Sequence, residues 1–555
     1  MTRFRYLPAL LAFVSVAAAT LMILHTYRVF EQTYDEGAQL AAGIEWLDHG
    51  SYRLDPVHPP LSRVAAALLP YLAGVRSAGT NFIWSDGNVE LDWGGEYQRN
   101  LTLARLGTLP FFWLSCFLIW RWMRHQFDPW HAALAVFFFA FCPVVLGHSG
   151  VATTDAPLMA MFLASVLAFW NLLEKPTWPT AIVAGLALGL GVLTKLTELP
   201  FFVLTAGSLW LCAWIATRRF PVSWRKLAAV FVVVCLTVWA GYRFRCGAVL
   251  PPDSLSGSTL ANYQALKPYQ KQILTWPGIP AAEFFRGAEK AYHSGSNGRV
   301  SFLLGQTYRG GHWYFFPVAI LAKTPVTLLI LALGAIGAGI VSGKWRRKRL
   351  AAVLLIAGIL GPLAVGMSAK INIGLRHILA IYPFAAMLGA IGTMYLWQLH
   401  GPRAIRIGAR VVVVLLALWN LESCLRAAPD LFAYFNEPAA PHASAILVDS
   451  DLDWGQDLKR LSAKLEEVHA HRVSLNILTS ADLTRAHLPA YRILQPGEEP
   501  SGWVAISEFE LKTTPEFRKF ENLPYQRVGR SIRLYYFAPG PARQTLQEMM
   551  PDFGI

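Results

Sequence analysis

The sequence predicts a polytopic α-helical membrane protein that carries a small α/β domain at its C-terminal end. Of its 555 residues, 54% are hydrophobic and only 15% are charged, whereas soluble globular proteins carry about 25% charged residues. Apolar runs of about 18 or more residues recur along the chain, which is typical of membrane-spanning helices. We expect residues 1–425 to form a transmembrane domain and residues 426–555 to form an extracytoplasmic α/β domain.

The apolar runs predict about eleven transmembrane helices. They cover residues 7–29, 101–120, 131–147, 156–173, 180–194, 199–216, 227–241, 313–341, 351–367, 377–396 and 411–424. The first run is too long for the core of a cleaved signal peptide. Two long loops, residues 30–100 and 242–312, separate groups of these helices. An apolar stretch at residues 61–73 is too short to span, so we expect it to lie along the membrane interface or to re-enter.

The distribution of basic residues predicts the orientation in the membrane. The net charge is +14, and the basic residues cluster in short segments between apolar runs. These include Arg121 and Arg124, Arg218 and Arg219, and Arg403, Arg406 and Arg410. Such segments are cytoplasmic under the positive-inside rule. The N-terminus is therefore expected in the cytoplasm, and both long loops and the C-terminal domain outside. The charge indicates the topology of a multi-pass inner-membrane protein and not a nucleic-acid partner.

Beyond residue 425 the sequence has the alternating patterns of a folded α/β unit. Residues 444–450, 472–478, 502–507 and 531–537 are predicted strands. Residues 453–468 predict an amphipathic helix with Leu458, Leu461 and Leu465 on one face. The six cysteines lie mostly in apolar runs, where Cys behaves as a small hydrophobic residue. They show neither metal-ligand spacing nor a disulfide framework.

Two adjacent carboxylates, Asp35 and Glu36, follow the first span. Neighbouring residues on a helix differ by about 100° in direction. One carboxylate can therefore face a cavity while the other turns towards a different partner. The alternative is a solvated acid pair at the interface that helps the next helix to begin.

His58 lies in the motif VHPPLSR, directly before two prolines. A residue before proline is held in an extended conformation, so the motif predicts a turn into the short apolar stretch that follows. His58 is then either a ligand, a sugar contact or only a turn residue.

The motif GHSGVATTDAPL places His148 and Asp155 between the third and fourth spans. Asp155 is either the N-cap of the fourth span or a second acid that is brought close to Asp35. His148 is a candidate substrate-binding residue at the same outer side of the membrane.

Four further candidates are a set of cationic and imidazole side chains at the outer ends of the spans. Lys195 ends a helix that carries no other charge, Arg376 and His377 lie at the outer end of the tenth span, and Lys370 is close in sequence. Cations at this level suit a phosphate group, because Arg can hold two oxygens in a fork and Lys acts as a point charge. The alternative is contact with lipid headgroups.

The sequence lacks the signatures of several other enzyme classes. No Walker loop, dinucleotide-binding glycine fingerprint, HExxH helix or CxxC pair occurs. Gly185, Gly189 and Gly191 resemble a phosphate loop, but no soluble strand precedes them. Small residues at this spacing more often allow close packing of helices. A protease or ligase would need a Ser or Cys nucleophile beside a His, and Ser149 next to His148 is only a pair of neighbours.

The stretch DSDLDWGQD, after the last span, is rich in acids. It holds Asp449, Asp451, Asp453 and Asp457. An EF-hand loop requires Gly at its sixth and Glu at its twelfth position, and here these are Trp454 and Arg460. Acids at a strand-to-helix junction are often helix caps or first-turn acids. The alternative is binding of an acceptor or a sugar, with Trp454 as a stacking platform.

Taken in order, the motifs YDEG, HPPL, ATTDAPL, GLALGLGVLTK and LRHILAIYPF make the chain resemble a known family over residues 7–396. This is the family of polyprenyl-phosphate-dependent membrane glycosyltransferases, glycosyltransferase family 39. It includes protein O-mannosyltransferases and aminoarabinose transferases and has the C-type fold. The tail, residues 434–461, also resembles a tail found in bacterial members of the family.

The resemblance implies a sugar donor linked through phosphate to a polyprenyl lipid, with the sugar on the outer side of the membrane. It implies that an acid in the first outer loop is the general base of an inverting transfer. Asp35 matches that acid, and Glu36 is its catalytic neighbour. Asp155 matches the acid of the second outer loop, which positions the acceptor or contacts a metal. Metal use varies in this superfamily, so a divalent metal stays open and no other cofactor is predicted.

The residues suit this chemistry. An acceptor hydroxyl is a poor nucleophile until a carboxylate removes its proton. The leaving lipid phosphate builds up negative charge, which Lys or Arg stabilises in a water-poor site. One carboxylate and one cation cluster are enough for a single displacement, whereas retention would need a carboxylate nucleophile.

We therefore predict a glycosyltransferase that moves a sugar from a polyprenyl-phosphate donor to an acceptor hydroxyl on a glycan, lipid or protein. The alternative is a non-catalytic membrane protein that binds or translocates polyprenyl-linked glycans. A transporter should show paired halves or helices broken at mid-membrane, and the sequence shows no clear repeat.

Overall fold

The computed structural model describes residues 6–250, 267–341, 343 and 348–538. Parts of the predicted second outer loop and of the predicted C-terminal domain therefore lie outside the described residues. Within these ranges, eight helices are long and apolar enough to cross a membrane. They are α1 (Leu7–Val29), α5 (Tyr97–Gln126), α8 (Asp155–Glu174), α10 (Glu198–Thr217), α11 (Trp224–Gly241), α18 (Arg349–Ser368), the unit Leu375–Trp397 and α20 (Arg403–Ala427). The unit Leu375–Trp397 consists of η4 (Leu375–Ile381) and α19 (Tyr382–Trp397).

Two further pairs of helices are apolar enough to span but are bent at a proline. The bends are 66° between α6 (Pro129–Ala140) and α7 (Pro143–Ser149), and 113° between α15 (Phe315–Lys323) and α16 (Val326–Val341). Cys142 and Thr324, which precede the prolines at the bends, have extended backbones, as residues before proline usually do. The shorter apolar helix α9 (Trp178–Val192) completes the set. Each predicted span coincides with one of these helices or pairs, and the number that crosses the bilayer stays a prediction.

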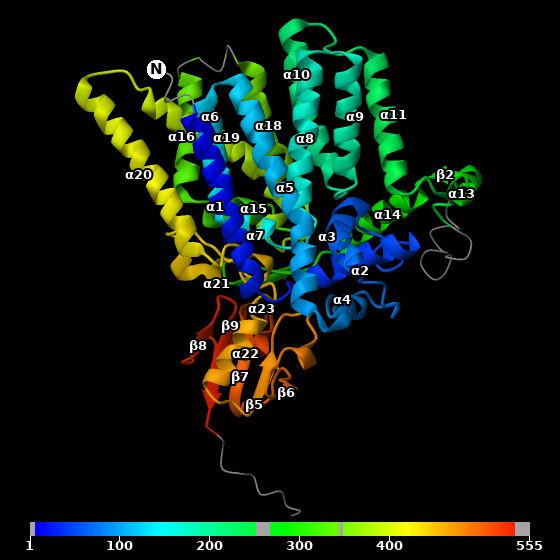
Figure 1. Ribbon diagram of the computed structural model, residues 1–555, viewed down its shortest axis with the longest axis vertical. Coiled ribbons are helices and arrows are strands. Elements are labelled where there is room, and N and C mark those ends of the chain that lie inside the picture. The colour runs from blue at the N-terminus through cyan, green and yellow to red at the C-terminus, as the bar shows by residue number, and fades with distance from the viewer. Residues whose placement is uncertain (1–5, 251–266, 342, 344–347, 539–555) are drawn as a thin grey trace, which may run out of the picture.

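Figure 1 shows the apolar helices side by side, with α1 beginning at the end of the bundle that lies far from the C-terminal sheet. The first predicted outer loop, residues 30–100, folds at the other end into α2 (Glu36–His49), α3 (Pro60–Leu72), α4 (Ile83–Leu91) and η2 (Trp93–Gly95). Helix α3 packs on α2 so closely that a Cβ on Gly43 would lie 2.2 Å from the carbonyl oxygen of Arg63. The predicted short apolar stretch is thus a helix packed on its neighbours.

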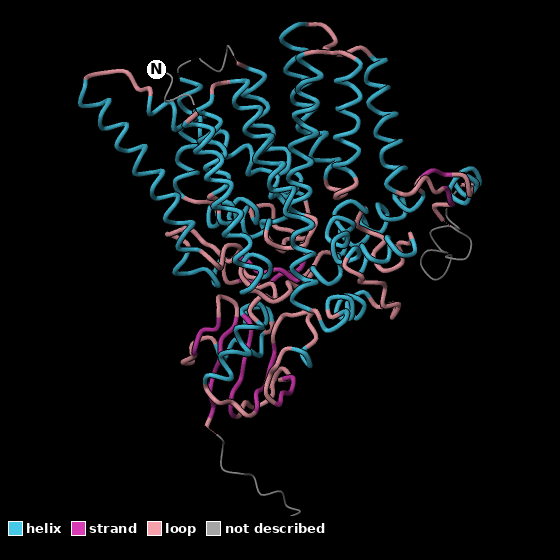
Figure 2. The backbone as a smooth tube through the Cα atoms, in the orientation of Figure 1, coloured by secondary structure: helices cyan, strands magenta, loops and turns pink. Residues whose placement is uncertain are grey.

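The second predicted outer loop, residues 242–312, is made of short elements in its described parts. They are β1 (Cys246–Gly247), α13 (Pro268–Thr275), β2 (Ile279–Pro280), α14 (Ala282–Asn297), β3 (Val300–Leu303) and β4 (Gln306–Arg309). Strands β1 and β2 pair in antiparallel fashion, and so do β3 and β4. Figure 2 shows these short pairs apart from the main sheet at the lower end of the molecule.

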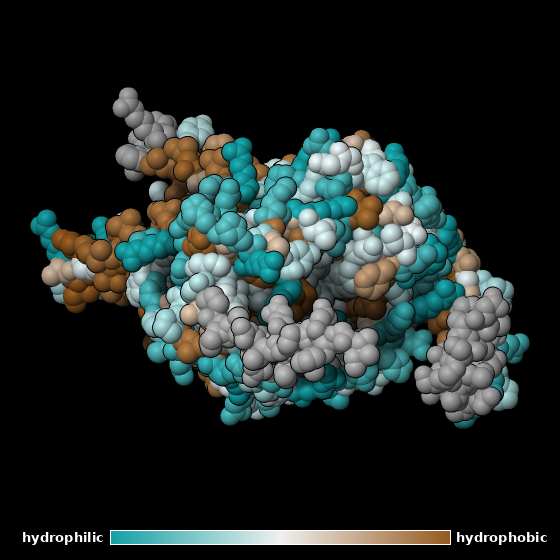
Figure 3. All heavy atoms as spheres, turned by 90° about the horizontal axis from the view of Figure 1, so that it is seen from below, coloured by the Kyte–Doolittle hydropathy of each residue, from teal (hydrophilic) through white to brown (hydrophobic). Residues whose placement is uncertain are grey.

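The C-terminal sheet has five strands in the order β6-β5-β7-β9-β8. The strands are β5 (Arg472–Asn476), β6 (Ala490–Ile493), β7 (Gly502–Ser507), β8 (Gln526–Val528) and β9 (Ile532–Phe537). Strand β5 is parallel to β6 and β7, and β9 is antiparallel to β7 and β8. The predicted strands at 472–478, 502–507 and 531–537 are confirmed. Seen from below, this end of the molecule presents mostly hydrophilic residues (Figure 3).

The two faces of the sheet are covered by different elements. Helix α22 (Leu458–Glu467) buries Leu458, Leu461 and Leu465 against one face, as its periodicity predicts. The opposite face packs on Leu511 of α23 (Glu508–Thr513) and on residues of η8 (Pro515–Phe520). Side chains of a strand alternate between the faces, so neighbouring residues of β7 belong to the two different cores. The remaining 3-10 turn in this unit is η7 (Leu483–Arg485).

The segment before the sheet differs from the prediction. Residues 444–450 do not form a strand: the chain forms η5 (Ala440–His442), α21 (Ala443–Ile446) and η6 (Asp449–Asp451) instead. The run is apolar because Leu447, Val448 and Leu452 are buried in the same core as the transmembrane helices. That core continues to Trp454. The sheet unit with cores of its own therefore begins near Leu458, and the predicted division of the chain at residue 425 stays a prediction.

The predicted packing of α9 is confirmed. A Cβ on Gly189 would lie 2.6 Å from Cβ of Thr237 on α11, and one on Gly185 would lie 2.7 Å from Cβ of Val233. The glycines thus bring the two helices together, as small residues do in membranes. The six cysteines are free, in agreement with the absence of a disulfide framework.

Candidate active site

Four charged side chains from four separate segments form one chain of ion pairs. Arg376 Nη1 lies 2.7 Å from Asp35 Oδ2 and 3.5 Å from Asp155 Oδ2. Lys195 Nζ lies 2.7 Å from Asp155 Oδ1. The order is therefore Asp35, Arg376, Asp155, Lys195, with alternating sign. The predicted convergence of these residues is confirmed, and their roles in chemistry stay predictions.

Helix ends place the two acids and the lysine. Asp35 directly precedes α2, Asp155 is the first residue of α8, and Lys195 follows the C-terminal end of α9. Carboxylates are stabilised at helix N-termini and cations at helix C-termini. Asp155 is not the N-cap, because that position is Thr154 and no side chain caps the helix there. Both oxygens of Asp155 instead bind cations.

The turn that carries Lys195 is held by the first outer loop. The backbone N–H of Leu61 donates to the carbonyl oxygen of Leu193 at 2.8 Å, and Ser62 Oγ donates to that of Thr194 at 3.1 Å. The end of the motif HPPL, at the start of α3, thus holds the turn that carries Lys195. The His58 ring itself is paired with Asp55, with 2.7 Å between Nδ1 and Oδ2.

Access from outside differs along the ion-pair chain. The Asp35 side chain is 29% exposed, whereas that of Asp155 is 0% exposed. The side chains of Arg376 and Lys195 are 9% and 12% exposed. Asp35 is therefore the carboxylate of this chain that a substrate can reach.

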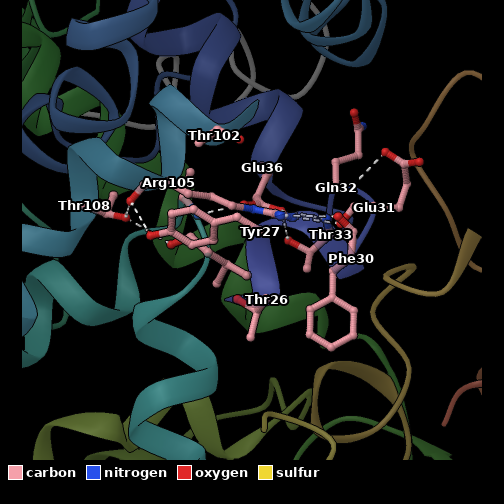
Figure 4. Close-up of polar contacts among 12 residues, drawn as sticks. Thr26, Tyr27, Phe30, Glu31, Gln32, Thr33, Glu36, Thr102, Arg105 and Thr108 are labelled. Atoms are coloured by element: carbon pink, nitrogen blue, oxygen red, sulfur yellow. Dashed lines mark hydrogen bonds and ion pairs between the residues drawn. The ribbon is translucent and has the colours of Figure 1, made fainter. Parts of the chain in front are cut away.

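Glu36 points away from this chain, as the angle between helical neighbours predicts. Its two oxygens accept from Arg105 Nε and Nη2, each at 2.8 Å (Figure 4). They also accept from the backbone N–H groups of Ala152 and Thr33, each at 2.8 Å. Burial alone would raise the pKa of Glu36, but the charge of Arg105 and these hydrogen bonds outweigh it and lower the pKa. The structure thus places Glu36 in a buried link between the first outer loop, α5 and the turn before Asp155.

The remaining predicted site residues are His377, His148 and Lys370. His377 is half-buried and follows Arg376 directly in η4. His148 is fully buried, and its ring nitrogens have no hydrogen-bond partner within the described part of the chain. Lys370 is exposed, and its Nζ donates to the carbonyl oxygen of Ser296 in the second outer loop at 3.4 Å.

The tail stretch DSDLDWGQD lies against Arg376, which the sequence did not predict. Arg376 Nε donates to Ser450 Oγ at 3.0 Å, and the guanidinium carbon lies 4.3 Å from the centre of the Trp454 ring. The Trp454 side chain is therefore a support for Arg376. Since it is only 2% exposed, it is not the free stacking platform for a sugar that the sequence suggested.

The acids of the tail stretch are not caps of the helix that follows them. Asp457 precedes α22 without a capping hydrogen bond, and its Oδ2 accepts from the backbone N–H groups of Arg530 and Ser531. Asp451 pairs with Lys323, with 3.7 Å between Oδ1 and Nζ. The sequence signal for these contacts is the run of acids between apolar residues. Acids that are buried with their apolar neighbours need partners inside the protein.

Asp449 adds a third carboxylate near the chain of ion pairs. Its Oδ1 accepts from the backbone N–H of Ser450 at 2.6 Å. Burial raises the pKa of Asp449 to about 7, the charge of Arg376 opposes this rise, and the charge of Asp35 adds to it. The carboxyl group of Asp449 therefore titrates near neutral pH, next to a guanidinium and a second carboxylate.

The described residues contain no group of three or more His, Cys, Asp or Glu side chains suited to a metal ion. The carboxylates at this site are instead paired with Arg376 and Lys195. These paired residues suit an anion that competes for the cations, and the question of a divalent metal, which the sequence left open, stays open.

Residues 98–242 match the family model described as dolichyl-phosphate-mannose-protein mannosyltransferase. No curated protein matches the chain.

Two solved structures show a similar fold, and a third is similar at a lower score. The S. cerevisiae protein O-mannosyltransferase Pmt1-Pmt2 complex bound to the sugar donor is similar with a TM-score of 0.55 and 11% identity, over 88% of this chain and 94% of that chain. The Archaeoglobus fulgidus oligosaccharyltransferase tethered with an acceptor peptide is similar with a TM-score of 0.50 and 12% identity, over 90% and 61%. ArnT from Cupriavidus metallidurans bound to undecaprenyl phosphate gives a TM-score of 0.46 and 13% identity, over 94% and 97%.

The chain is thus a polytopic membrane protein with the C-type glycosyltransferase fold and a small C-terminal sheet, as predicted. The predicted resemblance to the family of the protein O-mannosyltransferases is confirmed, with the family match itself at residues 98–242.

Proposed function

We propose that the chain transfers a sugar from a polyprenyl-phosphate-linked donor to an acceptor hydroxyl at the outer face of the cytoplasmic membrane. The observation that carries this proposal is Arg376 between Asp35 and Asp155, with Lys195 on the far side of Asp155. A reachable carboxylate and two cations then lie together at the ends of transmembrane helices. Inverting transfer from a lipid phosphate needs this combination.

Arg376 and Lys195 are the groups that suit the donor phosphate. Arg376 presents a planar fork and Lys195 a mobile point charge, and both side chains are largely buried. Charge stabilisation is strong where water is excluded. A phosphate that enters would compete with the carboxylates for these cations, and this competition would release Asp35 from Arg376.

Asp35 then removes the proton from the acceptor hydroxyl. The hydroxyl oxygen attacks the anomeric carbon while the bond from that carbon to the phosphate oxygen breaks. The electron pair of the broken bond leaves with the lipid phosphate, and the proton stays on the Asp35 carboxylate. One displacement of this kind inverts the anomeric carbon and requires no covalent intermediate. Asp155 is positioned to keep Arg376 and Lys195 together.

The position of the site supports an outer-face reaction. The ion-pair chain lies at the end of the bundle that faces the sheet, and α1 begins at the opposite end (Figure 1). The basic segments before α11 and at the start of α20 also lie at that opposite end. The positive-inside rule assigns that end to the cytoplasm, so the sheet unit and the site would lie outside.

A transfer assay tests the proposal. The purified chain in nanodiscs is given radiolabelled polyprenyl-phosphate sugars, and mass spectrometry of envelope glycans from a strain that lacks the chain identifies the sugar and the acceptor. We expect Asp35→Asn to lower the transfer rate by about 10²–10⁴, the usual contribution of a general base, and to retain donor binding. The control Asp482→Asn changes a partly exposed acid of the sheet unit, which pairs with Arg485.

Transfer by Asp35→Asn at the wild-type rate would remove Asp35 from the mechanism. Donor binding by the wild-type chain, with no transfer to any acceptor and unchanged envelope glycans, would instead support the alternative. The chain would then bind or translocate a polyprenyl-linked glycan without chemistry.

A further inference from the structure

The guanidinium of Arg376 is held from two sides, by carboxylates on one side and by uncharged side chains of the tail on the other. Nη1 faces the carboxylates of Asp35 and Asp155. The Nε atom and the flat face of the group are held by Ser450 and Trp454 of the tail. The proposed phosphate competes for the first side only. The second side therefore sets the plane of the guanidinium in both the free and the donor-bound states.

The approach of Ser450 to Arg376 depends on the backbone directly before η4. Ser450 Oγ donates to the carbonyl oxygen of Ile373 at 2.5 Å while it accepts from Arg376 Nε. Between them stands Gly374, with φ of 151°, and a Cβ at this position would lie 2.2 Å from Ser450 Oγ. Only glycine adopts such a backbone freely. Asp451 continues the contact, since its Oδ1 accepts from the backbone N–H of Leu375 at 3.1 Å.

The same tail stretch holds the opposite wall of the site. The backbone N–H of Tyr34, directly before Asp35, donates to the carbonyl oxygen of Trp454 at 2.9 Å. The N–H of Glu31 donates to the carbonyl oxygen of Gln456 at 3.0 Å. One short segment of the tail therefore contacts both parts of the site. It binds the backbone that leads to Asp35, and it binds the side chain of Arg376.

The sheet unit in turn holds this segment. Asp453 Oδ2 accepts from the backbone N–H of Phe509 at 2.9 Å, and Asp457 Oδ2 accepts from Ser531 Oγ at 2.9 Å. Both acids are buried, and a buried carboxylate is costly unless it is hydrogen-bonded. The docked sheet unit thus provides partners that keep the segment in place.

We propose that the tail segment Asp449–Asp457 is a working part of the active site, in which Ser450 and Trp454 are positioning residues for Arg376. This inference rests on the proposed function for its role in sugar transfer. The C-terminal sheet unit is then required because it sets the geometry of the phosphate-binding guanidinium.

Paired substitutions test the two contacts. Ser450→Ala removes the acceptor of Arg376 Nε. Its matched control is Ser462→Ala, a partly exposed serine on α22 whose hydroxyl donates to the carbonyl oxygen of His487. Trp454→Leu removes the ring beneath the guanidinium, Trp454→Phe keeps an aromatic face, and Trp503→Leu in β7 is the matched control. The measured quantities are the affinity for undecaprenyl phosphate, kcat and KM of transfer, and the melting temperature in detergent.

We expect Ser450→Ala to weaken undecaprenyl phosphate binding about tenfold or more, the effect of a lost hydrogen bond to a charged group. We expect Trp454→Phe to restore most of the binding that Trp454→Leu loses. The double variant Ser450→Ala/Arg376→Lys should bind no worse than Arg376→Lys alone, because both changes act on one group. The controls Ser462→Ala and Trp503→Leu should bind as the wild type does.

Wild-type affinity in Ser450→Ala, or additive losses in the double variant, would overturn the inference. Equal loss in Trp454→Phe and Trp454→Leu, together with lowered melting temperatures, would also overturn it and leave only a structural role. If the binding effects occur as expected and the wild-type chain transfers no sugar, the proposed function fails while the positioning of Arg376 stands.

Discussion

Replacement of Glu36 by Gln separates the two adjacent acids. The Glu36 carboxylate accepts hydrogen bonds from Arg105 Nε and Nη2 and from the backbone N–H groups of Thr33 and Ala152. An amide has one acceptor oxygen, and its NH₂ group would face donors. Glu36→Gln therefore leaves Arg105, which is 1% exposed, as a buried charge without a carboxylate partner.

The expected loss of stability is large. Removal of one partner of a buried ion pair costs about 3–5 kcal/mol, and folded proteins are stable by only about 5–15 kcal/mol. A loss of 1 kcal/mol lowers the Tm of a domain of 150–250 residues by about 2–4 °C. We expect a Tm lowered by at least about 5 °C for Glu36→Gln and by much less for Asp35→Asn. Asp35 is partly exposed, and Arg376 keeps Asp155 and Ser450.

Differential scanning fluorimetry in detergent measures both variants beside the wild type. The double variant Glu36→Leu/Arg105→Met should recover part of the loss, because apolar residues of similar volume often replace a buried pair without cost. A wild-type Tm for Glu36→Gln together with lost sugar transfer would refute the reasoning. Glu36 would then act in the chemistry and not as a buried link.

Three further predictions concern the cation and the tail. Arg376→Lys should weaken undecaprenyl phosphate binding by about 10–100-fold, because Lys lacks the fork; a titration that shows wild-type affinity would contradict this. Affinity for a sugar-phosphate donor should fall as the pH rises from 6 to 8, since Asp449, whose pKa burial raises to about 7, becomes negatively charged beside the phosphate. Asp449→Asn should flatten this dependence, and an equally steep profile would exclude Asp449. Gly374→Ala should abolish transfer and increase proteolysis of the tail, because its Cβ would displace Ser450; a tail as resistant to protease as that of the wild type would show that the contact is dispensable.

The periodicity of the sequence predicts the long apolar helices, α22 and three of the five strands of the sheet, but not β6, β8 or the helices α2, α4 and α14 of the long loops. Long apolar runs indicate helices that are apolar all round, and alternating patterns indicate strands that are buried on one face. The structure has helices and strands at these places. The exception is residues 444–450, whose apolar character reflects insertion into the core of the membrane helices. A short apolar run does not say which core will bury it.

The candidate site was predictable where helix ends carry charge. Asp35, Asp155, Lys195 and Arg376 stand at the ends of predicted spans on one side of the membrane, so topology alone brings them to one level. The angle between helical neighbours predicts that Asp35 and Glu36 point in different directions, but only the packing of Arg105 shows that Glu36 is the one that turns away from the ion-pair chain.

Contacts between distant segments could not be predicted from pattern. Ser450 reaches Arg376 because Gly374 leaves room for its hydroxyl oxygen. A single glycine within an apolar region does not by itself indicate which distant side chain packs against it. The run of acids in the tail indicated buried polar partners but not which ones.

The most direct test of the central claim is a structure of the Asp35→Asn variant with an intact polyprenyl-phosphate sugar bound. The account predicts that the phosphate oxygens lie within hydrogen-bond distance of Arg376 and Lys195. It also predicts that residue 35 faces the anomeric carbon from the side opposite the phosphate, as inversion requires. A phosphate bound elsewhere, for example at the basic start of α20, with the ion pairs of Arg376 unchanged, would contradict the account.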